Sequence, residues 1–285
     1  MIGDKKQDQT AREGSTAIQA GHDVHYHGMT VSEVKDICVL FLRDNFPQLR
    51  EEARKTAEEH VNNFAVMLES RLANDATSIV LDKFREPDVQ AAINDAVQAS
   101  ARKGPASNPQ ILSTLISERV TLKTNEYKDI VISEAVQVVP KLTHAQIALL
   151  SYVHFVTSVV IERLPNINGL EPYGQKALMF STPGFNLSAS QWQHIQYAGA
   201  ASVNNLVGGN IYQSLSSGAY KYLVPTEGGT FEKAVRQQAP SLSKLLDQFN
   251  NKNLFRMQLT SVGQAIAIAN ISNYLGKLDY TIWLK

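Results

Sequence analysis

Apolar and polar residues alternate over residues 15–28, which predicts two short strands around a tight turn. Gly21 supplies the positive φ that such a turn needs, and Asp23 also suits a turn. Because a lone two-stranded hairpin is only marginally stable in water, we expect strands from another copy of the chain to complete it. The residues predicted to carry this self-association are Ile18, Ala20, Gly21, Asp23, Val24 and Tyr26.

After the hairpin, apolar residues recur at spacings of three and four, which is typical of amphipathic helices. A first helix starts at Thr30 or Ser32 and is interrupted near Pro47, and a second runs from there to about Leu72. Further helices are predicted at residues 76–84, 87–102, 109–123, 125–140, 143–164, 188–207, 211–223, 231–250 and 261–275.

Two segments depart from the helical pattern. Residues 165–187 are rich in Asn, Gly and Pro and predict a long irregular connection. Its aromatic residues Tyr173, Phe180 and Phe185 are candidate anchors for a partner protein. Residues 279–285 alternate apolar and polar side chains, which predicts a terminal strand with Tyr280, Ile282 and Leu284 on one face.

These elements predict a mainly α protein, with a multi-helix body, a short N-terminal β-hairpin and a C-terminal strand. The predicted organisation is a flexible tail at 1–14, the hairpin at 15–28, a helical domain at 29–141 and a C-terminal helical domain at 142–285. An alternative for that last domain is a winged-helix-like module, because Leu259-Thr260-Ser261-Val262-Gly263 leads into an apolar helix and then the predicted strand. Thr143 is placed to cap the helix that follows it, and Ser261 and Gln264 have capping-box spacing.

Composition narrows the class of protein. Hydrophobic residues make up 44% and charged residues 19% of the 285 positions, which is typical of a globular chain. Lys plus Arg equals Asp plus Glu at 27 each, so no overall charge favours nucleic acid or an anionic membrane as a partner. The uncharged run Ala145–Ile161 is too short and too polar for a membrane span and predicts a buried helix. The N-terminus lacks an apolar signal core, which predicts a cytoplasmic bacterial protein.

The candidate chemistry is sparse. His22, His25 and His27 are either surface histidines on an exposed strand or metal ligands that a symmetric oligomer would complete. We favour the first interpretation, because no further ligand completes a closed site, and we predict neither a metal nor another cofactor. His154 lies among apolar residues and is expected to be a hydrogen-bonded core histidine. Cys38 lies on an apolar helix face and predicts a buried small side chain.

No enzyme motif stands out. The glycines of Gly199–Gly209 lack a phosphate-binding pattern, and close helix packing that ends at a glycine C-cap explains them. Four carboxylates in the middle of the chain are of the kind that any helix surface carries: Glu118, Glu126, Asp129 and Glu134. No nucleophile has a neighbouring base in the sequence, so catalytic activity is the less favoured interpretation.

Three segments together carry a resemblance to a known family: Ile18–Val24, Leu259–Gly263 and Asp279–Leu284. Their order and spacing resemble those of an uncharacterised bacterial family, and the resemblance covers nearly the whole chain. The Gln-Ala-Gly-x-Asp-Val element at its start is also seen in bacterial conflict and phage-defence proteins. The resemblance therefore implies an architecture and a biological setting, without implying a chemistry.

The sequence favours a self-associating scaffold or sensor that forms a homo-oligomer and binds an unknown protein partner, and the resemblance places it in antiphage defence. A nucleic-acid-binding regulator with a winged-helix-like C-terminal half is the first alternative. The second is a membrane-acting effector built around Ala145–Ile161.

Overall fold

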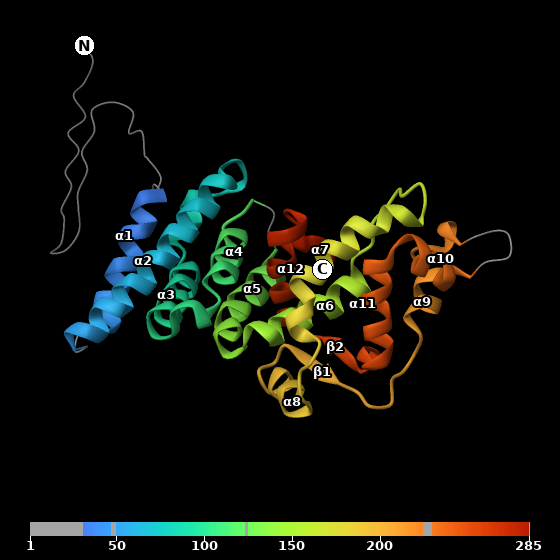
Figure 1. Ribbon diagram of the computed structural model, residues 1–285. Coiled ribbons are helices and arrows are strands. Elements are labelled where there is room, and N and C mark those ends of the chain that lie inside the picture. Colours follow the sequence, from blue (N-terminus) through green and yellow to red (C-terminus); the bar gives the residue numbers. More distant parts are fainter. Residues whose placement is uncertain (1–30, 47–49, 123–124, 225–229, 285) are drawn as a thin grey trace, which may run out of the picture.

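The computed structural model describes residues 31–46, 50–122, 125–224 and 230–284. Within these ranges the chain is mainly helical, with one short antiparallel sheet, so the prediction of a mainly α fold is confirmed (Figure 1). The helices are α1 (Val31–Asn45), α2 (Glu51–Asn74), α3 (Pro87–Lys103), α4 (Pro109–Arg119), α5 (Glu126–Val138), α6 (His144–Ser158), α7 (Glu171–Ser181), α8 (Ala189–Tyr197), α9 (Ile211–Ser217), α10 (Phe231–Gln238), α11 (Pro240–Asn251) and α12 (Ser261–Leu275). The strands are β1 (Ala201–Val203) and β2 (Met257–Leu259).

From α1 to α6 the helices follow one another across the molecule (Figure 1). Helices α1, α2 and α3 form one end, and α9, α10 and α11 lie toward the other. Helix α12 returns to the centre and packs against α4 and α5 on one side and α6 and α7 on the other. The hydrophobic core therefore continues across position 142, where the sequence suggested a domain boundary.

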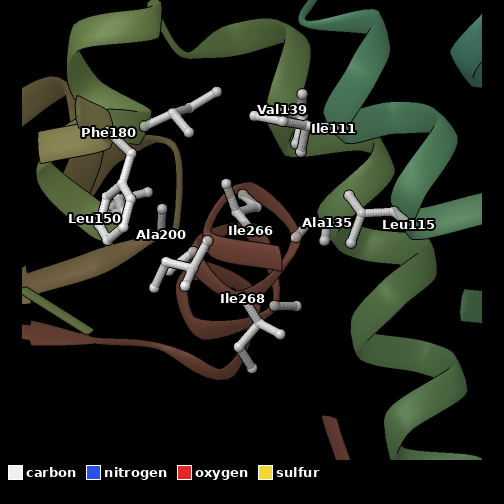
Figure 2. Packing of buried hydrophobic residues seen from close by; sticks show 14 of the residues in the cluster. Ile111, Leu115, Ala135, Val139, Leu150, Phe180, Ala200, Ile266 and Ile268 are labelled. Carbon is white, nitrogen blue, oxygen red and sulfur yellow. The ribbon is translucent and has the colours of Figure 1, made fainter. Parts of the chain in front are cut away.

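The sequence of α12 explains its central position. Its fifteen residues include no charged side chain, and a helix that is apolar on all sides is stable only when it is buried. Figure 2 shows Ile266 and Ile268 within this core, with Leu115 and Ala135 on one side and Leu150 on the other. The helix that follows the Leu-Thr-x-x-Gly segment thus contributes its whole middle to the core.

The start of α12 is fixed by the small sheet. Strands β1 and β2 pair in antiparallel register, with Ala201 opposite Leu259. Thr260 is the N-cap of α12, because its side chain accepts a hydrogen bond from the backbone N–H of Gly263 at 3.1 Å. A side chain at Gly263 would meet the carbonyl oxygen of Ala200 at 1.8 Å, so only glycine allows this approach. The predicted capping box at Ser261 is wrong, whereas the capping box at Thr143 forms.

Helix α6 is the buried helix that the uncharged run predicts. Its residues from Gln146 to Val156 are all buried, and it ends at Ser158 rather than at the expected residue 164. In the part of the chain that the structure describes, no helix is long and apolar enough to cross a membrane.

Helix α1 packs one face against α2 and α3. Val34, Cys38 and Leu42 on this face are buried, so the prediction of a buried cysteine is confirmed. Burial raises the pKa of the Cys38 thiol to about 12, which keeps the thiol protonated at neutral pH.

The prediction of an irregular connection at 165–187 is wrong, because this segment contains α7. Pro172 lies in the first turn of α7, where proline is tolerated, and Ala177 and Phe180 form its buried face. Glycine and proline content was therefore a poor guide in this segment.

Other predicted helices are shorter than expected or divided. The helix predicted at 188–207 ends at Tyr197, where Gly199 adopts a positive φ of 82° and the chain continues into β1. The helix predicted at 231–250 is divided into α10 and α11 before Pro240, which starts the second of them. The predicted helix at 76–84 forms two short 3-10 helices, η1 (Ala76–Ser78) and η2 (Leu81–Arg85).

The predicted C-terminal strand is also wrong. Residues Tyr280–Ile282 form a 3-10 helix, η9, because the Asp279 carboxylate accepts hydrogen bonds from the backbone and hydroxyl of Thr281. Tyr280 and Leu284 are buried, but Ile282 is 57% exposed, so the three do not share a face. The predicted tail and hairpin, at 1–14 and 15–28, lie outside the described residues.

Candidate functional site

A cleft of about 460 Å³ opens where the C-terminal segment crosses the ends of α2 and α4. This size is within the range of small-molecule binding sites. Its lining residues come from three stretches of the chain: Asn74, Asp75, Thr77 and Ser78, then Glu118, Thr121 and Leu122, and finally Lys277, Leu278 and Asp279.

Backbone hydrogen bonds hold two walls of the cleft together. The connection after α2 pairs with the residues that follow α4, through an isolated antiparallel bridge between Ile79 and Thr121. The N–H of Val80 donates to the carbonyl of Val120 at 2.8 Å, and the N–H of Leu122 donates to that of Ser78 at 3.0 Å. This pairing ends α4 at Arg119, before the expected residue 123.

Lys277 connects the third wall to the other two. Its Nζ lies 3.1 Å from Oδ1 of Asp75 and donates to Oγ of Ser78 at 3.2 Å. The other carboxylate oxygen of Asp75 accepts a hydrogen bond from the hydroxyl of Ser117 at 3.1 Å. Asp75 therefore joins the end of α2 to α4 and to the C-terminal segment.

An ion pair lies at the floor of the cleft. Nζ of Lys128, a residue that is 0% exposed, lies 2.5 Å from Oε1 of Glu118. The same Nζ is 5.9 Å from the ring centroid of Tyr280, a cation–π arrangement. Burial raises the pKa of Glu118, and the nearby charge of Lys128 opposes that shift.

A second buried cation lies beside this pair. Nη1 of Arg119 is 3.0 Å from Oδ2 of Asp129, and Nη2 is 3.6 Å from Oε2 of Glu86. Arg119 also forms an ion pair with Asp88. Glu86 and Asp88 lie at the start of α3, and Asp129 lies on α5. Arg119 therefore connects α4 to both of these helices.

The C-terminal segment covers both the ion pair and the end of α6. Tyr280 is buried next to Lys128, and Nε1 of Trp283 donates to the carbonyl of Ser158 at 3.1 Å. The ring of Trp283 also lies 5.1 Å from that of His154, edge to face. The segment thus connects the end of α2 with the end of α6.

His154 is a buried core histidine, as predicted, but it is not hydrogen-bonded. Both of its ring nitrogens lack a partner among the described residues. Burial lowers the pKa of His154 to about 4, so its imidazole is neutral at neutral pH.

The sequence interpretation missed this cluster. Glu126 and Glu134 are exposed, as expected, but Glu118 is buried and Asp129 is half-buried. The overlooked signal is the position of Lys128 three and seven residues before Val131 and Ala135, in the stripe that α5 buries. A lysine at an apolar position of a helix stripe needs a buried counter-charge.

The structure places the predicted site residues as follows. The hairpin residues Ile18, Ala20, Gly21, Asp23, Val24 and Tyr26, and the histidines His22, His25 and His27, lie outside the described residues. Phe180 is buried, with its ring 5.8 Å from that of Phe155, so it has no free face for a partner. Tyr173 and Phe185 are partly buried and pack against the core.

The cleft can interact with a ligand through the charged groups that line it. Three carboxylates line it, those of Asp75, Glu118 and Asp279, together with the single ammonium group of Lys277. Among the described residues, no group of three His, Cys, Asp or Glu side chains is placed to hold a metal ion.

A family model matches residues 28–230 and 224–284, which together include all the residues that the structure describes. No curated protein and no solved structure matches the chain.

Proposed function

The chain belongs to the uncharacterised family that its terminal motifs resemble, and we propose that it is a self-associating scaffold or sensor that acts by binding another protein. Its self-association would involve residues 15–28, whose alternating pattern requires further strands. The Gln-Ala-Gly-x-Asp-Val element in this segment is the reason to place the protein in bacterial defence against phage.

The observation that carries the proposal is the acidic cleft at the C-terminal segment. Asp75, Glu118 and Asp279 line it together with Lys277, which pairs with Asp75, so a basic side chain of a partner protein would compete with Lys277 for the Asp75 carboxylate. The cleft also lies where one short segment, residues 277–284, connects the end of α2 with α5 and α6. A partner bound there would act on the contacts between the two halves of the chain, as a sensor requires.

The nucleic-acid alternative has less support. A winged helix reads DNA with an exposed recognition helix. Helix α12, which follows the Leu-Thr-x-x-Gly segment, is buried from Val262 to Gly263 and again from Ala265 to Ala269. It therefore has no free middle face to insert into a groove.

The test introduces an arginine at the mouth of the cleft. Thr77 lines the cleft and is exposed, so Thr77→Arg would occupy the acidic site without disturbing the buried ion pair. Thr56→Arg, on the exposed face of α2, is the matched control. Tagged full-length chains would be captured by affinity during phage infection, and co-purified proteins would be identified by mass spectrometry.

We expect the wild type and Thr56→Arg to recover the same partner protein and to protect cells, and Thr77→Arg to lose both. Equal recovery of the partner by all three chains would show that the cleft does not bind it. Stoichiometric nucleic acid in the purified material, or turnover of nucleotides by the chain, would contradict a binding-only function. Light scattering on the purified wild type tests self-association separately.

A further inference from the structure

Residues 177–220 contain no Asp, Glu, Lys or Arg, although these four residue types make up 19% of the chain. The segment runs from α7 through α8 and β1 to α9, and much of it is exposed. Charged residues are almost never fully buried, so they are expected mainly at exposed positions such as these. An exposed region without them is typical of the centre of a protein–protein interface, where charged residues are depleted.

Two strongly exposed apolar side chains lie within this segment. Leu206 is 97% exposed and Tyr197 is 88% exposed, the largest exposed fractions of any large apolar side chain among the described residues. Tyr197 is the last residue of α8, and its ring lies 6.4 Å from that of His194. Leu206 lies in a turn in which its N–H donates to Oδ1 of Asn204 at 3.0 Å. Side chains that ordered backbone already presents lose less conformational freedom when they bind.

Contacts between α8 and β1 bring these two positions to one part of the molecule. Oε1 of Gln196, the neighbour of Tyr197, accepts a hydrogen bond from the N–H of Val203 at 3.3 Å. The turn that carries Leu206 follows directly after Val203. Figure 1 shows α8 and β1 together at the lower edge of the molecule. The exposed residues of α8, β1 and this turn form what we call the α8 surface: Gln193, Gln196, Tyr197, Ser202, Asn204 and Leu206.

The composition of the α8 surface indicates which partner fits it. A surface that binds a different protein can carry charge, because the partner supplies the opposite charge. A surface that binds its own copy across a two-fold axis meets the same groups again, so a charge near the axis faces a like charge. Amide and hydroxyl side chains avoid this conflict, because each can both donate and accept hydrogen bonds. The α8 surface consists of such side chains and of Tyr197 and Leu206, which gain from leaving water.

We propose that a second copy of the chain packs its α8 surface against this one across a two-fold axis. Tyr197 and Leu206 of both copies would then be removed from water together, and the amide groups around them would pair. Arg256 contacts α8 from the side of β2, but its half-buried guanidinium lies over the ring of Trp192, 5.5 Å from the centroid. The inference rests on the proposed self-association and gives it a second contact, separate from residues 15–28.

The experiment measures the dissociation constant of the full-length chain by analytical ultracentrifugation. Tyr197→Lys and Tyr197→Glu each place like charges on the two facing surfaces, so we expect each to raise the constant about tenfold or more. Val66→Lys and Val66→Glu are the matched controls, because Val66 is a 53% exposed apolar residue of α2, and they should leave it unchanged. Circular dichroism of every variant would confirm that the chain remains folded.

A mixture of variants tests whether the surface faces its own copy. When Tyr197→Lys and Tyr197→Glu chains are mixed in equal amounts, opposite charges lie on the facing surfaces. The mixture should therefore associate about tenfold more tightly than either variant alone. Each separate variant should also regain affinity at about 1 M NaCl, since salt screens like charges, whereas the wild type should not depend on salt. A mixture no tighter than its components would overturn the two-fold contact.

A variant of residues 15–28 separates this inference from the proposed function. Val24→Asp places a charge at an apolar position of that segment and should weaken self-association there. We expect the Val24→Asp chain still to dimerise and the double variant with Tyr197→Lys to be monomeric. A monomeric Val24→Asp chain would overturn the α8 contact and leave association through residues 15–28 standing. Oligomers that only Tyr197→Lys dissociates would support the α8 contact and contradict the one at residues 15–28.

Two further outcomes would overturn the inference. A monomeric wild type would overturn both contacts between copies. A Tyr197→Lys chain that keeps the wild-type dissociation constant but no longer recovers the partner protein would assign the α8 surface to that partner instead.

Discussion

Two of the ion-pair clusters among the described residues lie in opposite surroundings. At the centre, Lys128 pairs with Glu118 under the C-terminal segment, and neither side chain reaches much water. Near the far end, the guanidinium of Arg236 on α10 makes two parallel hydrogen bonds to Asp247 on α11, at 2.6 and 2.7 Å. It also pairs with Glu232 at 2.9 Å, yet its side chain is 47% exposed.

The two clusters differ in how much net stability each ion pair contributes to the folded chain. The geometry of the Arg236 cluster is close to ideal. Its ion pairs nevertheless contribute little net stability, because water screens their charges. Burial strengthens the attraction between Lys128 and Glu118, but both charges first lose their hydration. The central pair therefore adds little net stability. It does require both residues to be present, because either charge left alone in the core is unfavourable.

The largest effect should come from breaking the central pair. Lys128→Met keeps most of the unbranched apolar chain but leaves Glu118 as a buried charge without its partner. We expect a loss of about 3–5 kcal/mol in the free energy of unfolding. Urea denaturation followed by circular dichroism measures this quantity.

The double variant Glu118→Leu with Lys128→Met is the control for this prediction. It removes both charges, and a buried pair replaced by apolar residues is often neutral or stabilising. Most of the lost stability should therefore return. If the double variant were as unstable as the single one, lost packing rather than the unpaired charge would be responsible.

The second effect concerns His154, whose ring nitrogens have no hydrogen-bond partner among the described residues. His154 lies under the same C-terminal segment, and burial lowers its pKa from 6.5 to about 4. Between these two values the unfolded chain binds a proton that the folded chain does not, so stability falls as the pH falls from about 6.5 to about 4. The shift corresponds to a loss of about 3 kcal/mol at the acidic end.

The measurement is the free energy of unfolding between pH 7 and pH 4 for the wild type and two variants. Carboxylates also titrate in this range, so the informative quantity is the difference between chains. His154→Leu should remove about 3 kcal/mol of the pH dependence, whereas His144→Leu, at an exposed position, should leave it unchanged. Parallel curves for the wild type and His154→Leu would show that the folded chain protonates His154 without cost.

The sequence could predict the elements whose causes are local. Helix α12 has the predicted bounds, because an uncharged apolar run after a capping threonine determines both its start and its burial. Cys38 is buried because it shares a stripe with Val34 and Leu42. Glycine and proline content misled where tertiary contacts decide, as in α7, whose Phe180 packs against Phe155 and Tyr274.

The candidate site could not be predicted, because its parts are distant in the sequence. Nothing near Glu118 indicates that Lys277 and Tyr280 will cover it. The terminal alternation predicted a strand, whereas Asp279 caps a 3-10 turn that directs Tyr280 toward Lys128. Only the lysine in the apolar stripe of α5 indicated a buried charge.

The smallest effect should come from the exposed cluster. Arg236→Gln removes a charge that pairs with Glu232 and Asp247 and lies over the ring of Tyr212, at 5.5 Å from its centroid. The carboxylates left behind remain accessible to water, and Asp247 keeps the hydrogen bond from the hydroxyl of Tyr212 at 2.9 Å. We therefore expect the Tm to fall by about 2 °C or less. At about 1 M NaCl the difference from the wild type should vanish, since salt screens exposed charges, while the Lys128→Met difference should persist. A loss for Arg236→Gln that matched Lys128→Met and withstood salt would break the comparison, because geometry rather than burial would then determine what an ion pair is worth in this fold.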